Sequence, residues 1–295
     1  MTSLLRRVRT TLSIHAHRKV RGMLDGEYTS VFHGRSLEFD DLRPYVAGDE
    51  IKDIDWKATA RLGSLQTRRY VASRKHTIVF VVDTGRSMAA LAASGENKRD
   101  VAILAAGTAG YMATRHGDVV ALVASDADGT SYLRPESTEA HLERMLQRIH
   151  DRTTLSSGLS GLSAGLSFVA RAFRHGRILI VISDDRELDA TEQKLLRRLS
   201  VQHEILWLTI GDADLVRESW SDRPMSDVED ASSLPEFVRQ DKRVRAEFAA
   251  AVSERELRGQ ELFESLSISR QRITSEANVV SGFFHLLELH KHARR

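Results

Sequence analysis

Oxygen-bearing side chains in three segments of the chain are of the kinds that hold a hard cation. Residues 83–88 begin with an aspartate directly after an apolar run and also carry a threonine and a serine. Residues 183–185, Ser-Asp-Asp, follow a second apolar run, and Thr153 and Thr154 lie between the two segments along the chain. Carboxylates and hydroxyls are ligands that suit Mg²⁺, which takes about six oxygens. We expect the three segments to converge on one cation site.

Four apolar runs predict the strands that would bring these segments together. The runs are rich in Val, Ile and Leu, and they cover residues 77–82, 118–123, 178–182 and 205–210. Strands that are apolar throughout are buried on both faces, as in a parallel sheet. Helical patterns lie between them, at 99–115, 141–149, 155–173 and 191–199. The predicted fold class is α/β, a doubly wound and mostly parallel sheet, whose ligands bind outside the carboxyl ends of the strands.

Changes in composition divide the chain into four segments. Residues 1–26 predict a helix, and residues 27–75 predict a small β-rich subdomain punctuated by Gly, Asp and Pro. Residues 76–214 hold the alternating strands and helices of the main domain. Residues 215–295 form a charged, mostly helical extension, in which 267–273 predict a short edge strand able to close the same domain.

The N-terminal helix has two interpretations. Leu4, Leu5, Val8 and Leu12 recur at helical spacing among arginines. Such a helix either docks on its own domain or lies on an anionic membrane surface. The apolar stripe is narrow and lacks Trp and Phe, which favours docking.

The overall composition sets limits on the class of protein. Hydrophobic residues make up 41% of the 295 and charged residues 28%, an ordinary balance for a globular protein. The chain has no cysteine, which excludes disulfides, thiolate metal sites and cysteine nucleophiles. A net charge of +2 gives no indication of nucleic-acid binding, which requires clustered basic residues. No apolar run is long enough to span a bilayer. We expect a cytoplasmic protein that binds no nucleic acid.

A catalytic interpretation competes for the same residues. Asp83 would be the nucleophile of a Mg²⁺-dependent phosphoryl transfer, with Asp184 and Asp185 as metal ligands. Phosphatases that resemble haloacid dehalogenases place a second aspartate two residues after the first, where this chain has Gly85. The single Asp-Thr-Gly triplet also lacks the second copy that an aspartic protease requires. We expect the protein not to be an enzyme, with phosphoryl transfer as the alternative.

Residues 83–88 resemble the metal-ion-dependent adhesion site of von Willebrand factor type A domains. That pattern is Asp-x-Ser-x-Ser, followed by a distant Thr and a distant Asp. On this resemblance the metal ligands are Asp83, Ser87, Thr153 and Asp184. Thr154 is the other candidate for the threonine, and Gly85 replaces the middle serine. The resemblance implies a protein-interaction site that binds Mg²⁺ weakly, with water expected to fill the gap at Gly85.

Residues 34–61 resemble the hallmark block of the domain of unknown function 58 family. The block reads Gly-Arg-Ser-Leu-Glu-Phe-Asp-Asp-Leu-Arg-Pro-Tyr at 34–45, Gly-Asp-Glu-Ile at 48–51 and Ile-Asp-Trp-Lys-Ala-Thr-Ala-Arg at 54–61. In that family a short β-rich unit with this block precedes a von Willebrand factor A-like domain. Members are commonly associated with MoxR-type AAA+ ATPases as adaptors or co-chaperones, so the resemblance implies a partner of that type.

The charges of this block have two physical interpretations. The block contains many charged residues of both signs and few apolar ones. Such charges either hold two subdomains together by ion pairs or form a docking face. The candidate partner-binding residues are Arg35, Glu38, Arg43, Asp49, Asp55, Trp56 and Arg61.

Overall fold

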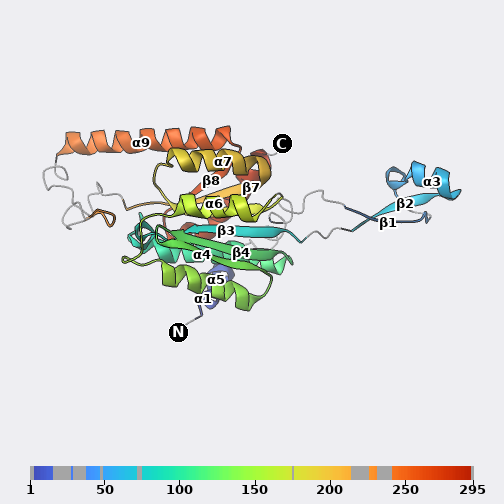
Figure 1. Cartoon of the computed structure of the whole chain (residues 1–295), viewed down its shortest axis with the longest axis horizontal. Helices are drawn as coiled ribbons and strands as arrows, with labels where there is room; N and C mark the ends of the chain where they lie inside the picture. Colours follow the sequence, from blue (N-terminus) through green and yellow to red (C-terminus); the bar gives the residue numbers. More distant parts are fainter. Residues whose placement is uncertain are drawn as a thin grey trace.

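The computed structural model of the chain contains a six-stranded sheet covered by helices and a two-stranded unit of its own (Figure 1). The residues that the structure describes are 3–15, 28, 38–46, 49–71, 75–174, 176–213, 226–230 and 241–293.

The main sheet has the strand order β5-β4-β3-β6-β7-β8. Its strands are β3 (Thr77–Asp83), β4 (Val119–Asp126), β5 (Gly129–Glu136), β6 (Ile178–Asp184), β7 (Glu204–Ile210) and β8 (Ser269–Ile273). All neighbours are parallel except β5, which pairs antiparallel with β4. The order runs outward from β3 in both directions, which confirms the prediction of a doubly wound, mostly parallel sheet.

The central strands are apolar on both faces because each face is covered. In β3, Ile78, Phe80 and Val82 belong to one core, and Val79 and Val81 belong to the other. All five side chains are buried, and their alternation follows from the two-residue period of a strand.

Two layers of helices cover the two faces of the sheet and complete these cores (Figure 1). The first layer contains α1 (Leu4–His15), α4 (Lys98–Arg115), α5 (Glu139–Arg152) and α10 (Val279–Ala293). The second contains α6 (Leu162–Ala172), α7 (Ala190–Gln202) and α9 (Lys242–Ser265). Helix α7 begins at a capping box formed by Asp189 and Glu192.

The loop before α6 differs from the prediction of a helix over 155–173. The helix begins only at Leu162, because residues 153–161 run against the end of β4, where Ser160 bridges Asp126. A Cβ atom at Gly161 would lie 2.3 Å from the carbonyl oxygen of Asp126. Gly165 within α6 allows close packing on the sheet, since a Cβ atom there would lie 2.5 Å from the hydroxyl oxygen of Ser125. Strand β5 has no predicted counterpart, since its partly exposed residues form no apolar run.

The small unit, defined here as residues 38–46 and 49–71, has its own antiparallel pair of strands. β1 (Glu38–Pro44) pairs with β2 (Gln66–Val71), and η2 (Ile51–Asp53) and α3 (Trp56–Leu62) lie between them. Figure 1 shows the unit clear of the main sheet and its helices. The carboxylate of Asp55 caps α3, and Gly63 ends it in the left-handed conformation, with φ of 70°.

Residues from outside the predicted main domain, on both its N-terminal and C-terminal sides along the chain, also pack into it. Of the first part of the predicted β-rich subdomain, residues 27–37, the structure describes only Tyr28. Tyr28 is buried in the main core, where its hydroxyl donates to Asp118 at 2.6 Å and its ring stacks on His116. At the other end, the predicted edge strand is β8, and α10 packs against it.

Helix α1 packs its apolar stripe on α4 and α5. Leu5, Val8 and Leu12 are buried, and Val8 fills the space beside Gly107 of α4. The carboxylate of Glu143 in α5 accepts hydrogen bonds from the backbone N–H groups of the first turn, at 2.8 and 3.0 Å. The structure therefore shows the docked arrangement of this helix. Among the described helices, none is both long and apolar enough to cross a bilayer.

Replacing Leu5 by Ala should reduce the free energy of unfolding by about 2–5 kcal/mol, because it empties a buried site between α1 and the main domain. Chemical denaturation measures this loss. Arg6→Ala, on the exposed side of the same helix, is the matched control and should change stability by no more than about 0.5 kcal/mol. Equal effects of the two changes would contradict the docked position of α1.

Candidate functional site

Three neighbouring strands each deliver an aspartate to the carboxyl edge of the sheet. Asp83 ends β3 and Asp184 ends β6, as predicted, and Asp212 follows β7. These strands are adjacent in the order β3-β6-β7. The parallel direction of the strands therefore brings three carboxylates to one edge, of which the sequence analysis anticipated two.

The carboxylate of Asp83 is buried and hydrogen-bonded at both oxygens. One oxygen accepts from the backbone N–H groups of Gly85 at 2.9 Å and Gly161 at 3.4 Å. The other accepts from the hydroxyl of Ser160. Burial raises the pKa of Asp83 to about 6, the charge of Asp184 adds to that rise, and the hydrogen bonds oppose it.

The space beside Gly85 is filled by backbone. A Cβ atom at this position would lie 2.7 Å from the backbone nitrogen of Ser160 and 2.8 Å from the carbonyl carbon of Leu159. The expectation of a water-filled gap here is therefore wrong. The loop at 159–160 occupies that space, and Ser160 supplies a hydroxyl to Asp83 from a position that sequence spacing did not indicate.

The remaining predicted ligands are only partly brought together. By distance and angle, the buried hydroxyl of Ser87 and one buried oxygen of Asp184 have no hydrogen-bond partner among the described residues. The two groups are nevertheless close enough for the Ser87 hydroxyl to lower the pKa of Asp184. The hydroxyl of Thr153 donates to the carbonyl of Ile149 at 2.8 Å, which closes α5. The hydroxyl of Thr154 lies 3.0 Å from two serine hydroxyls of its own loop. Neither threonine hydroxyl is hydrogen-bonded to the aspartates of the edge.

Two cationic side chains lie among these acids. Lys98, the first residue of α4, is 1% exposed, and its ammonium pairs with Asp212. Arg186 pairs with Glu192, and its Nε atom lies 3.8 Å from Asp184. Burial raises the pKa of Asp184, and the positive charge of Lys98 is the largest effect that opposes the rise.

The sequence analysis missed Lys98 although its position carried a signal. A cation in the first turn of a helix is disfavoured by the helix dipole. Lys98 stands there at the start of a helix whose next twelve residues are largely buried. A lysine in such a position requires a specific acidic partner.

The assembled residues do not fit a Mg²⁺ ion. Magnesium requires close to octahedral coordination by about six oxygens. Both oxygens of Asp83 already accept hydrogen bonds, Gly85 offers no hydroxyl, and Lys98 and Arg186 place positive charge beside Asp184. Within the described part of the chain, no group of three or more acidic or histidine side chains is arranged to hold a metal ion.

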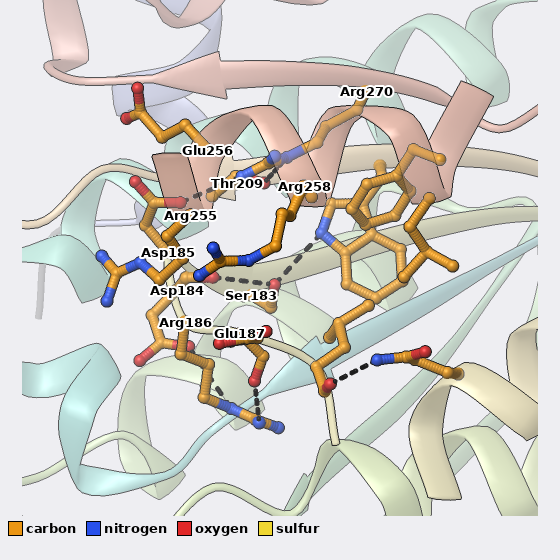
Figure 2. Close-up of a pocket in the computed structure, with 16 residues that line it drawn as sticks. Ser183, Asp184, Asp185, Arg186, Glu187, Thr209, Arg255, Glu256, Arg258 and Arg270 are labelled. Atoms are coloured by element: carbon orange, nitrogen blue, oxygen red, sulfur yellow. Dashed lines mark hydrogen bonds and ion pairs between the residues drawn. The ribbon is translucent and has the colours of Figure 1, made fainter. Parts of the chain in front are cut away.

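A cavity of about 200 Å³ lies next to Asp184, between α9 and the carboxyl ends of β6 and β7 (Figure 2). Trp207 and Phe263 form part of its apolar wall. Figure 2 shows guanidinium groups and carboxylates interleaved around it, and Arg270 donates to Asp185 at 2.9 Å. Its arginines are Arg186, Arg255, Arg258 and Arg270, and its acids are Asp184, Asp185, Glu187 and Glu256. The formal charges of these eight side chains balance.

The charged residues of the hallmark block mostly hold the small unit together. Arg43 donates to Asp49 at 2.7 Å, and Asp49 also accepts from a backbone N–H of its own turn. These hydrogen bonds, the backbone one foremost, lower the pKa of Asp49. Asp55 caps α3. Arg35 lies outside the described residues, and the side chain of Glu38 is not among those described.

The small unit also concentrates exposed apolar side chains. Twelve large hydrophobic residues are exposed in the described part of the chain, and five of them lie between positions 46 and 65. These five are Val46, Ile51, Trp56, Leu62 and Leu65. Arg61 is exposed among them. Three more exposed residues, Leu91, Leu155 and Leu159, lie in the loops near Asp83.

Comparison with known proteins gives a family match and distant relatives. A family model described as protein of unknown function DUF58 matches residues 41–258. Uncharacterised proteins of Mycobacterium bovis and Mycobacterium tuberculosis are 25% identical to the chain over 245 residues. Each alignment covers 82% of this chain and 76% of the relative.

Two solved structures have similar folds at low sequence identity. A von Willebrand factor type A protein from Catenulispora acidiphila gives a TM-score of 0.43 at 13% identity, over 77% of this chain. The chain spans only 44% of that protein. An aerotolerance-related membrane protein from Bacteroides fragilis, solved with multiple mutations to serines, gives 0.39 at 16% identity, over 63% of this chain and 98% of that one.

Gly85→Ser should destabilise the protein by about 1–3 kcal/mol, because the new Cβ atom meets backbone rather than a movable side chain. Thermal and denaturant unfolding measure the change. Gly259→Ala in α9 is the control, since only the flexible end of Arg270 lies within 4 Å of its Cβ position. If Gly85→Ser were as stable as the unchanged protein, the loop at 159–160 would not fill that space.

Asp83→Asn should flatten the dependence of stability on pH. The pKa of about 6 in the folded protein exceeds the ordinary value of 3.8, so the folded state binds more protons between these values. The stabilising contribution is thus full below about pH 4 and is lost as pH rises through about 6. The loss at neutral pH is about 3 kcal/mol. Urea unfolding of both proteins across this range measures it, and parallel curves would contradict the buried state of Asp83.

Proposed function

Because the chain belongs to the family of proteins of unknown function DUF58, whose curated relatives are uncharacterised, we propose its role from its own surfaces: it is a non-enzymatic protein-interaction module. The module works as an adaptor, and its main contact is the small unit. The α/β domain behind it is a rigid support.

The observation that carries this proposal is the exposure of Trp56. Its side chain is 64% exposed at the start of α3, although tryptophan is usually well buried. Tryptophan and arginine are enriched among the residues that dominate binding energy in protein interfaces, and Arg61 is exposed on the same short helix. Four further exposed apolar residues in the small unit enlarge the apolar area that a partner would cover.

The hydrogen bonds within the small unit support the same role. Arg43, Asp49 and Asp55 bond within the unit, to one another or to backbone N–H groups. The charges of the hallmark block thus hold the turn and α3 in place, and the exposed apolar residues are presented on a fixed frame. A preorganised surface loses less entropy on binding.

The proposed partner is a MoxR-type AAA+ ATPase. Support for this choice comes from the resemblance of residues 34–61 to the hallmark block of a family commonly associated with such ATPases. The proposed place of action is the cytoplasm, where ATP for such a partner is available. Assembly or maturation of other proteins is the proposed process.

The carboxyl edge of the sheet is a second proposed contact. Leu91, Leu155 and Leu159 are exposed in the loops beside it, which gives a partner apolar contacts next to the charged cluster. The proposal assigns no Mg²⁺ to this contact, because the donor set does not fit the ion.

The alternative of phosphoryl transfer by Asp83 lacks a suitable geometry. An attacking carboxylate must reach its substrate, but Asp83 is fully buried and both its oxygens accept hydrogen bonds. Its neighbours do not assemble into a magnesium site that would orient a phosphoryl group. The burial of Asp83 therefore favours the proposed interaction module over phosphoryl transfer.

Trp56→Ala should weaken capture of a MoxR-type ATPase from the same genome by at least about tenfold, because it removes an interface anchor. Purified proteins and biolayer interferometry measure the affinity. Val201→Ala, at an even more exposed apolar residue of α7, is the control and should leave capture unchanged.

Leu155→Ala separates the two proposed contacts. Loss of capture in Leu155→Ala together with normal capture in Trp56→Ala would overturn the small unit as the main contact. No capture by the unchanged protein, with ATP or without it, would overturn the choice of partner.

A further inference from the structure

We propose that the ammonium of Lys98 permanently fills the role of the cation at the carboxyl edge, so that this edge is assembled and held without a divalent metal ion. The inference concerns the main domain alone and does not depend on the proposed partner. It rests on the burial of Lys98, on its acidic neighbours and on the loop that positions it.

Lys98 is held in place by its backbone and by the residues before it. Its N–H donates to the carbonyl of Ala90 at 2.9 Å. The side chain of Asn97 caps α4 at the N–H of Arg99 and also donates to the carbonyl of Ala89 at 3.1 Å. The start of α4 is therefore tied to the loop that follows Asp83, and the lysine enters the edge from a fixed point.

The charge of Lys98 is enclosed, whereas that of its direct partner is not. The side chain of Lys98 is 2% exposed, and that of Asp212 is 46% exposed. An ammonium buried to this degree in the first turn of a helix is disfavoured by both desolvation and the helix dipole. Its retention inside the protein therefore depends on the negative charge around it, supplied by Asp212 in direct contact and by Asp184 nearby.

The same acids are those that a divalent ion would need. A cation bound by Asp184 and Ser87 would lie close to Lys98 and Arg186, whose charges would repel it. Asp83 is engaged with Ser160 and two backbone N–H groups and is not free to help. The internal lysine thus serves as a fixed counter-charge, and the edge should be indifferent to chelators.

Direct titration of the full-length protein tests this. After dialysis against EDTA, calorimetry with MgCl₂ and with MnCl₂ should show no saturable binding up to about 1 mM, a range in which many weak cation sites fill. The unfolding temperature should also be the same with EDTA and with either metal. Saturable binding of Mg²⁺ or Mn²⁺ by the unchanged protein, abolished by Asp184→Asn, would overturn the proposal.

Lys98→Met should reverse this behaviour. It removes the charge at similar length and leaves Asp184 and Asp212 without their cation, so stability should fall. Mn²⁺ should then raise the unfolding temperature of this variant but not that of the unchanged protein. Lys194→Met, at an exposed lysine of α7, is the matched control and should change neither property.

The double variant Lys98→Met with Asp212→Asn keeps the test decisive if the single variant does not fold. Removing the acid with the base should recover part of the stability lost in Lys98→Met and should abolish the response to Mn²⁺. A single variant as stable as Lys194→Met, or a double variant less stable than Lys98→Met, would overturn the role of Lys98 as the counter-charge of this edge.

Discussion

The burial of the central strands on both faces is the constraint on which the rest of the structure depends. β3, β6 and β7 carry apolar residues at almost every position, and only a sheet between two layers of helices hides such strands from water. The helices that cover them must cross from one strand end to the next, which makes the strands parallel. Parallel strands in turn end at the same edge, and whatever side chains stand at those ends are brought together.

Those strand ends carry aspartates, whose negative charges must be compensated where they are buried. Asp83, Asp184 and Asp212 lie on three adjacent strands, and two of these carboxylates are almost completely buried. Burial of negative charge is tolerated only with hydrogen bonds or a positive partner. Here Asp83 receives hydrogen bonds from the chain, and Lys98 and Arg186 supply positive charge for the others. This neutralisation is the basis of our proposal that the edge is held without a metal ion.

The small unit differs from the main domain in how its charged and apolar residues are placed. Its described charged residues include an ion pair and a helix cap, and five of its larger apolar residues are exposed, whereas Ile54 is buried. In a unit of this size there is too little apolar surface to build a core of its own. The exposed apolar residues of the unit, Trp56 foremost, are the basis of the proposed protein contact.

The sequence by itself determined the fold class and the positions of Asp83 and Asp184, because two-residue and helical periodicity are local properties of the chain. It also predicted the docking stripe of α1, since only the spacing of apolar residues was needed. Boundaries that depend on other segments were missed. The helix expected from residue 155 begins at Leu162, because the preceding loop is held by contacts with β4.

Only the tertiary structure decided the chemistry of the edge. Sequence spacing treated Gly85 as a missing hydroxyl, whereas backbone from the loop at 159–160 fills the space and Ser160 donates to Asp83 from 77 residues away. Spacing also gave no reason to bring Lys98 to Asp212, 114 residues further along the chain. Such pairings depend on which loops meet when the sheet closes, and local periodicity carries no information about distances between loops.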